Sequence, residues 1–283
     1  MTSRVVANSG YSLSRVPTWL NDPANWRGSE GLLARIREHL MYTGVAVVIA
    51  LLIALPVGLF IGHTGRGVVV VAGLANGLRA VPSLGLVILF IVFLVPKIHY
   101  THAVFGLVPR GALPYVIPVE IVLVILAIPP ILTNTYAGVQ NVDPAARDAA
   151  AGMGMRGMQV LRKVEFPCAL PLIMSGIRSA TLQVIATATV AAYAPFLGGL
   201  GRFIVDGVGQ LNDPVHGYTA MVAAAIVVAV LAVVVDLILL GVQRLVVSPG
   251  VSGRFSDNAA LSDKAAPSDV VLSNLEQKAS ATA

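Results

Sequence analysis

Four charged side chains interrupt the long apolar runs of this sequence: Arg79, Glu120, Arg178 and Asp236. Each costs roughly 2.5–3.5 kcal/mol of insertion free energy at the centre of a membrane helix, so each should face protein or water. They could line a polar pathway or form ion pairs between helices. For Arg178 and Glu120, near the ends of their runs, an interhelical pair or a position at the membrane surface is favoured. For Arg79, Asp236 and the nearby Asn76 both roles stay open, and no particular arginine is indicated as the partner of Asp236.

Catalytic chemistry finds little support in the sequence. A nucleotide-binding P-loop requires a Gly-Lys pair, and none occurs in the chain. Ser83, Ser175 and Ser179 lie in apolar surroundings without the G-x-S-x-G turn of a hydrolase. His99 and His102 have a spacing that suits a metal, but no further ligand is near, so a solvated loop is favoured. We therefore expect no catalytic residue, no metal and no cofactor on this chain, and any energy source must be another chain or an ion gradient.

The main polar and basic island between the apolar runs is residues 143–167, DPAARDAAAGMGMRGMQVLRKVEFP. Asp143 before Pro144 is typical of a helix start, and the alanines that follow favour a helix that another surface can approach closely. Glycines then end this helix, and a second short helix is expected over 157–164. The pattern predicts a helix–turn–helix elbow at a membrane surface. The spacing i, i+3, i+4, i+7 predicts one apolar stripe, formed by Ala146, Ala149, Ala150 and Met153.

The spacing in this island resembles the EAA loop of ABC-importer permeases, written E-A-A-x3-G-x9-I-x-L-P. Aspartate replaces the glutamate, valine the isoleucine and phenylalanine the leucine. The matching positions are Asp148, Ala149, Ala150, Gly154, Val164, Phe166 and Pro167. In that family the loop docks into a groove on a separate ATPase subunit. The resemblance implies that these residues couple this chain to such a subunit.

Segments on both sides of the island resemble the compatible-solute branch of these permeases, which imports glycine betaine, choline, carnitine or proline betaine. They are PPILTNTYAG at 129–138, ATAT at 186–189 and GGLGR at 198–202, and the resemblance covers about residues 31–247. It implies three partners: an ATPase, an extracytoplasmic substrate-binding protein, and a second permease copy or paralogue. It also implies a multi-pass protein of the bacterial inner, or plasma, membrane.

Quaternary ammonium solutes are typically held over aromatic ring faces. Because only 6% of the residues are aromatic, high-affinity recognition is expected in the separate binding protein. Tyr193 and Phe196 could touch a passing solute, although packing is the favoured role. Residues 198–211 could form an external lip.

The elements that must position these residues are membrane helices. The chain is 56% hydrophobic and only 12% charged, which indicates an all-α, polytopic membrane bundle. The resemblance implies that this bundle is of the type I ABC-importer permease kind. About five spans are expected, at Leu40–Gly62, Val68–Val95, Val116–Gly138, Leu170–Phe196 and Tyr218–Val247.

The second run, 68–95, is expected to be one long kinked helix, because two spans would each need about 17 residues or more. Two half-length spans, giving six in total, are the alternative. With five spans and a cytoplasmic elbow, the N-terminus lies outside. The arginines of the N-terminal tail then oppose the positive-inside tendency.

The predicted domains are a polar tail over 1–39, a permease domain over 40–247 and a disordered tail over 248–283. An amphipathic lead-in lying along the membrane is expected over 31–39. The net charge of +5 is attributed to basic loops facing anionic lipid, and nucleic-acid binding is not expected. Two alternative functions stay open: an ion-gradient-driven transporter of a small polar solute, and an ABC permease for another solute such as an amino acid.

Overall fold

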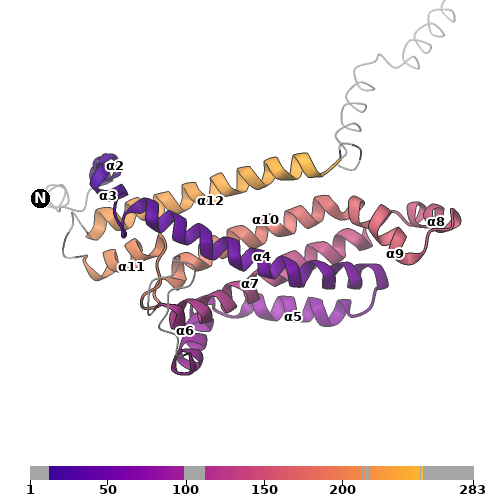
Figure 1. The fold of residues 1–283 in the computed structure, drawn as a ribbon, viewed down its shortest axis with the longest axis horizontal. Coiled ribbons are helices and arrows are strands. Elements are labelled where there is room, and N and C mark those ends of the chain that lie inside the picture. Colours follow the sequence, from indigo (N-terminus) through magenta and orange to yellow (C-terminus); the bar gives the residue numbers. More distant parts are fainter. Residues whose placement is uncertain (1–12, 99–111, 212, 214–216, 249, 251–283) are drawn as a thin grey trace, which may run out of the picture.

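The computed structural model describes residues 13–98, 112–211, 213, 217–248 and 250, and within them it contains helices and no strand (Figure 1). The predicted all-α membrane bundle is confirmed. The helices are η1 Leu13–Arg15, α2 Val16–Asn21, α3 Pro23–Trp26, α4 Leu32–Thr64, α5 Val68–Ala80, α6 Ser83–Leu94, η2 Val95–Lys97, α7 Leu113–Gln140, α8 Pro144–Gly152, α9 Gly157–Val160, η3 Leu161–Glu165, α10 Phe166–Ala191, α11 Gly201–Gly209 and α12 Thr219–Val246.

Helix α7 is the centre of the bundle, with α4 and α10 packed along it and α5 and α6 also against it. Helix α12 lies on the outside, against α10 and α11 (Figure 1). The elbow formed by α8 and α9 is at one end of the bundle, and α11 with the short N-terminal helices is at the other (Figure 1). Large apolar side chains on the outer faces of α4 and α12 stay exposed, such as Leu52 and Leu245, as expected for surfaces that meet lipid.

The contact between α4 and α7 depends on small residues at every fourth position of α4. All are buried, and the row consists of Ala46, Ala50, Ala54, Gly58 and Gly62. A Cβ on Gly58 would lie 2.7 Å from Cβ of Thr135, and one on Gly62 would lie 2.6 Å from Cβ of Val139. The two backbones are therefore closer than a side chain allows, which is how membrane helices gain packing energy without a hydrophobic driving force.

We expect Gly58→Leu to lower the midpoint of thermal unfolding of the purified protein, because the added side chain must push α4 away from α7. Overpacking of this kind costs about 1–3 kcal/mol. Gly44→Leu is the matched control, since Gly44 lies in the same helix and a Cβ added there would have no neighbour within 4 Å. Equal unfolding midpoints for the two variants would show that close α4–α7 contact does not stabilise the fold.

The predicted second span is not one helix, and this prediction was wrong. The chain breaks at Val81, which is extended (φ −76°, ψ 128°), because the Pro82 ring disfavours helical backbone in the residue before it. The resulting α5 and α6 have 13 and 12 residues. Within the described part of the chain, four helical segments are long and apolar enough to cross a membrane: Leu32–Thr64, Leu113–Gln140, Gly157–Ala191 and Thr219–Val246.

The broken pair α5–α6 nevertheless makes one return passage. Helix α4 ends beside the elbow, where His63 meets Glu165, and α5 begins there. Helix α7 begins at the opposite end, where Tyr115 touches the ring of Phe196. Six passages would start α7 at the elbow end, so the arrangement supports five and not the six-span alternative.

Two smaller elements also differ from expectation. The predicted lead-in over 31–39 is the first two turns of α4 rather than a separate surface helix. The second helix of the elbow continues into α10 through the π-helical turn η3, where the N–H of Phe166 bonds to the carbonyl of Leu161. Pro167 has no N–H to donate to the preceding turn, which favours the wider turn at this point.

Candidate functional site

The elbow between α7 and α10 is built by local sequence rules. The Asp143 side chain accepts a hydrogen bond from the N–H of Ala145 at 2.9 Å and caps α8. Gly154, beyond the end of α8, has φ +82°, a left-handed conformation that a side chain would strain. The N–H of Arg156 donates to Oε1 of Gln159 at 2.8 Å and starts α9. The predicted helix–turn–helix is confirmed.

Helix α8 presents a clear outer face. Asp148, Ala149 and Gly152 are exposed, and Met153 beside them is 72% exposed. Ala150, in contrast, is 1% exposed, so its side chain packs inside the elbow. The predicted apolar stripe therefore straddles the border between the outer and inner faces of α8 and does not form one surface.

The inner face of α8 reaches a buried carboxylate that the motif does not mark. Glu165 is 2% exposed, and its Oε1 lies 3.0 Å from Nε of Arg147 as an ion pair. Its Oε2 lies 2.6 Å from Nδ1 of His63, in the last turn of α4. The Arg147 guanidinium also donates to the carbonyl of Val139, in the last turn of α7. Glu165, the last residue of η3, thus links α4 and α8, and Arg147 extends this link to α7.

His63 is enclosed from a second side. A Cβ on Gly157 would lie 3.3 Å from Nε2 of His63, so the backbone at the start of α9 covers the ring. The start of α9 and the Arg147–Glu165 pair thus both lie against the end of α4. Sequence reasoning missed this network, because His63 and Glu165 are 102 residues apart and neither sits at a motif position.

The last three motif residues lie where the elbow enters the bundle. Val164, Phe166 and Pro167 are half-buried. Phe166 packs against a small cluster that includes Val139 and Ile173. Phe166 thus packs at the contact between α10 and α7, whereas Asp148, Ala149 and Gly154 are exposed at the outer end of the elbow.

The charged side chains within the bundle divide into two cases. Arg178 on α10 forms a bidentate salt bridge with Asp236 on α12, with Nε–Oδ1 and Nη2–Oδ2 distances of 2.9 and 2.8 Å. The interhelical role favoured for Arg178 is confirmed, and the arginine that meets Asp236 is identified. Glu120 forms no ion pair with the described residues, and its Oε2 is buried without a hydrogen bond to them.

Several predictions lie outside the part of the chain that the structure describes. The helix backbone at Asn76 and Arg79 is described, but their side chains are not, so their proposed pathway role stays a prediction. His99 and His102 fall in the undescribed segment 99–111, and the C-terminal tail beyond 250 is likewise outside. Among the described residues no group of three or more His, Cys, Asp or Glu side chains is placed to hold a metal ion.

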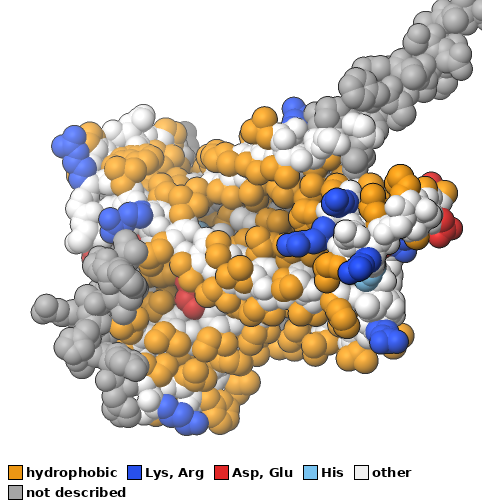
Figure 2. Space-filling model, turned by 45° about the vertical axis from the view of Figure 1, so that its right-hand side comes forward, with side chains coloured by type: hydrophobic (Ala, Val, Ile, Leu, Met, Phe, Trp, Pro, Cys, Tyr) orange, Lys and Arg blue, Asp and Glu red, His pale blue; other side chains and the backbone are white. Residues whose placement is uncertain are grey.

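The surface fits a bundle embedded in lipid with a polar elbow at its end. On the face shown in Figure 2, hydrophobic side chains cover most of the length of the bundle, and Lys and Arg side chains gather near the elbow.

A family model described as the inner membrane component of binding-protein-dependent transport systems matches residues 32–247. The chain belongs to this family. It is a membrane-embedded transport component, and the match begins at Leu32, the first residue of α4.

Several named relatives match most of this chain. The glycine betaine/carnitine/choline transport system permease protein OpuCB of Bacillus subtilis is 32% identical over 223 residues, 78% of this chain and 91% of the relative. The carnitine transport permease protein OpuCB of Listeria monocytogenes is 34% identical over 72% of this chain and 83% of the relative. The osmoprotectant import permease protein OsmW of Salmonella typhimurium is 30% identical over 78% of this chain and 94% of the relative.

The fold also matches solved structures. Inward-facing conformations of the MetNI methionine ABC transporter align with a TM-score of 0.60 at 20% identity, over 77% of this chain and 96% of the matched chain. A second crystal form aligns with a TM-score of 0.56 at 21% identity. At this identity the likeness concerns the fold, and it agrees with the predicted type I importer architecture.

Proposed function

We propose that this permease forms the translocation pathway of an ATP-driven importer for a compatible solute of the glycine betaine, choline, carnitine or proline type. An extracytoplasmic binding protein delivers the solute, and a second copy or paralogue completes the pore. The permease itself binds no cofactor, and ATP is used by a partner ATPase subunit. The observation that carries the proposal is the exposed face of α8, formed by Asp148, Ala149 and Gly152 at the elbow end of the bundle.

The buried network supports a route for force from the ATPase to the pore. A partner that displaces α8 moves Arg147, which is paired with Glu165 at the root of α10. Glu165 in turn is paired with His63 at the end of α4. Because the α4–α7 contact is close-packed, α4 and α7 should move as one body around this joint. The elbow would then convert closure of the ATPase pair into tilting of the spans.

Relatives of this permease carry glycine betaine, carnitine and choline according to their names, which supports the same solute class here. The methionine transporter supports the architecture alone, since its identity with this chain is 20–21%. An ion-gradient mechanism would leave the exposed face of α8 without a role.

The experiment is uptake into vesicles that contain the permease together with its ATPase and binding protein. We expect uptake of labelled glycine betaine or choline that requires ATP and persists when ion gradients are collapsed. Omitting the ATPase subunit is the control and should abolish uptake. Uptake that depends on an ion gradient and not on ATP would overturn the proposal.

A further inference from the structure

A cavity of about 650 Å³ opens at the end of the bundle opposite the elbow. Its wall comes from the start of α4 and Glu30 just before it, the residue that precedes α7, the connection between α10 and α11, and α11 itself. Tyr193 and Phe196 from that connection line it, together with Arg35 and Arg202. Because α4, α7 and α10 are the packed core of the bundle, the cavity lies over the helices that would form the solute pathway.

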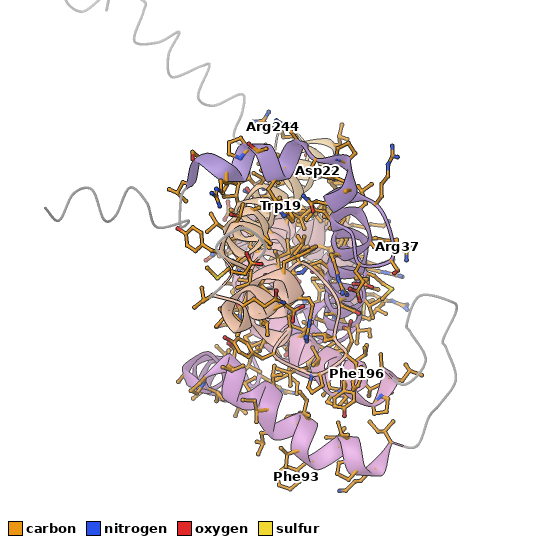
Figure 3. All side chains as sticks on the ribbon, turned by 90° about the vertical axis from the view of Figure 1, so that its left-hand side faces the viewer. Trp19, Asp22, Arg37, Phe93, Phe196 and Arg244 are labelled. Carbon is orange, nitrogen blue, oxygen red and sulfur yellow. The ribbon has the colours of Figure 1, made fainter. Side chains whose placement is uncertain are left out.

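Both aromatic rings are held out of the core. Tyr193 is 55% exposed and Phe196 is 69% exposed. Phe196 has φ +61°, a left-handed conformation that is uncommon for a bulky side chain. Its neighbour Leu197 is 2% exposed, so the chain beside Phe196 is anchored in the core while the ring turns outward. Figure 3 looks onto this end of the molecule and labels Phe196 there.

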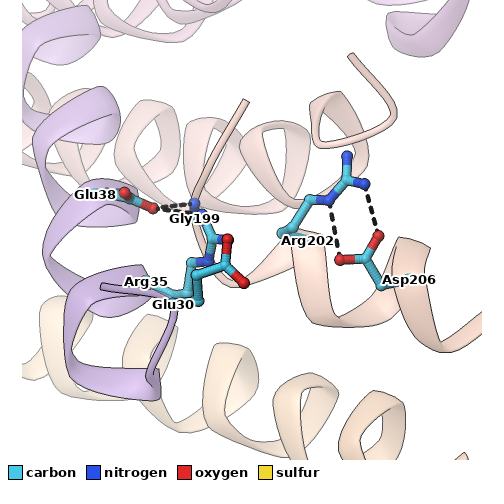
Figure 4. Close-up of polar contacts among 6 residues, drawn as sticks. All are labelled: Glu30, Arg35, Glu38, Gly199, Arg202 and Asp206. Atoms are coloured by element: carbon cyan, nitrogen blue, oxygen red, sulfur yellow. Dashed lines mark hydrogen bonds and ion pairs between the residues drawn. The ribbon is translucent and has the colours of Figure 1, made fainter. Parts of the chain in front are cut away.

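A hydrogen-bond network fixes the connection in this shape. The N–H of Gly199 donates to Oε2 of Glu38 at 2.8 Å, and Nη1 of Arg35 donates to the same oxygen at 3.1 Å (Figure 4). A Cβ on Gly198 would clash with that oxygen, so the loop passes directly over the carboxylate. The surrounding structure therefore holds the backbone of Phe196 in its strained conformation. Residues with strained backbones of this kind are concentrated at ligand-binding and active sites.

The two arginines that line the cavity are each paired with a carboxylate. Arg202 is held by Asp206 through contacts of 3.0 and 2.7 Å, and Arg35 is held by Glu38 (Figure 4). Glu30 has an 85% exposed side chain and only a 3.8 Å contact to Arg35. Both arginines that line the cavity are thus paired with carboxylates outside its lining, and Glu30 supplies the carboxylate within the lining.

We propose that this cavity is a receiving site for the methylated ammonium group of the solute, held against the rings of Phe196 and Tyr193 near the carboxylate of Glu30. Ring faces attract such cations, and the nearby negative charge adds to that attraction. The inference deepens the proposed function and depends on it. It replaces the packing role favoured for these two aromatic residues from sequence alone.

The test is direct binding of choline to the complete permease–ATPase complex without the binding protein, measured by saturation-transfer NMR titration. The uncharged isostere 3,3-dimethylbutan-1-ol is the second probe. Phe196→Gly removes the ring and accepts the left-handed backbone, Phe196→Tyr keeps the ring, and Phe93→Ala removes an aromatic ring that is 60% exposed on α6 (Figure 3).

We expect Phe196→Gly to weaken choline binding about tenfold, and the uncharged isostere to bind the wild type several-fold more weakly than choline. Phe196→Tyr and Phe93→Ala should bind choline as the wild type does. An unchanged dissociation constant in Phe196→Gly, equal binding of the two probes, or no choline binding by the wild type would overturn the inference. If ATP-dependent choline uptake persists in those cases, only this binding site is wrong. Absence of uptake in the wild type and in every variant would count against the proposed function itself.

Discussion

Ala149→Arg is expected to release the ATPase subunit from the permease and to abolish ATP-driven uptake. Ala149 is exposed on the outer face of α8, between Asp148 and Gly152, where small side chains allow a partner to approach the backbone. An arginine at the centre of such a contact should weaken it about 100-fold, on the order of 3 kcal/mol. Co-purification of the ATPase with tagged permease, together with solute uptake, measures both effects.

Two variants serve as controls for this experiment. Ala149→Ser changes the volume little at the same position and should retain the ATPase and uptake. Ala150→Arg should behave differently, because Ala150 is 1% exposed and the arginine must enter the elbow itself. That variant should lower the thermal stability of the isolated permease, which Ala149→Arg should leave unchanged. If the Ala149→Arg variant co-purifies with as much ATPase as the wild type does, this face is not the docking surface.

Glu165→Gln is expected to leave the ATPase bound but to reduce the solute imported per ATP hydrolysed by about tenfold or more, within the range usual for coupling between sites. The glutamine cannot balance the charge of Arg147, which lies 3.0 Å from the carboxylate in the wild type. It also replaces the carboxylate oxygen that lies 2.6 Å from Nδ1 of His63. Helix α8 should then move without carrying α4 with it. The measurement is the ratio of uptake to ATP hydrolysis in the same vesicles.

A double-mutant cycle decides whether this network acts as one unit. Arg147→Gln alone should uncouple transport about as strongly as Glu165→Gln, and the double variant should lose little more than either. Additive losses would mean that the two side chains act separately. A wild-type ratio of uptake to hydrolysis in Glu165→Gln would rule out the network as the route for force.

Together these two experiments separate docking from transmission. Loss of the partner in Ala149→Arg concerns the outer face of α8, and loss of coupling with the partner retained in Glu165→Gln concerns its inner face. The motif spacing alone does not distinguish the two faces, because Ala149 and Ala150 are neighbours in the same motif and only one of them is exposed.

Much of this protein could be predicted from contiguous residues. Apolar runs with few charges indicate membrane helices, Asp143-Pro144 indicates the start of α8, and the glycines indicate the turn after it. The motif spacing predicted the elbow and the family. Each of these features depends on local backbone chemistry or on side chains a few residues apart, which is why the sequence pattern carries them.

The tertiary structure decided which distant side chains meet. Nothing near Glu165 in the sequence indicates that it is buried against His63, and nothing near Asp236 selects Arg178 as its partner, 58 residues away. The outward turn of Phe196 depends on a loop that Glu38 holds from another helix. A charge in a helix requires a partner but does not specify one, because any helix that packs against it can supply the opposite charge. Only the packing of α4, α7, α10 and α12 makes that choice.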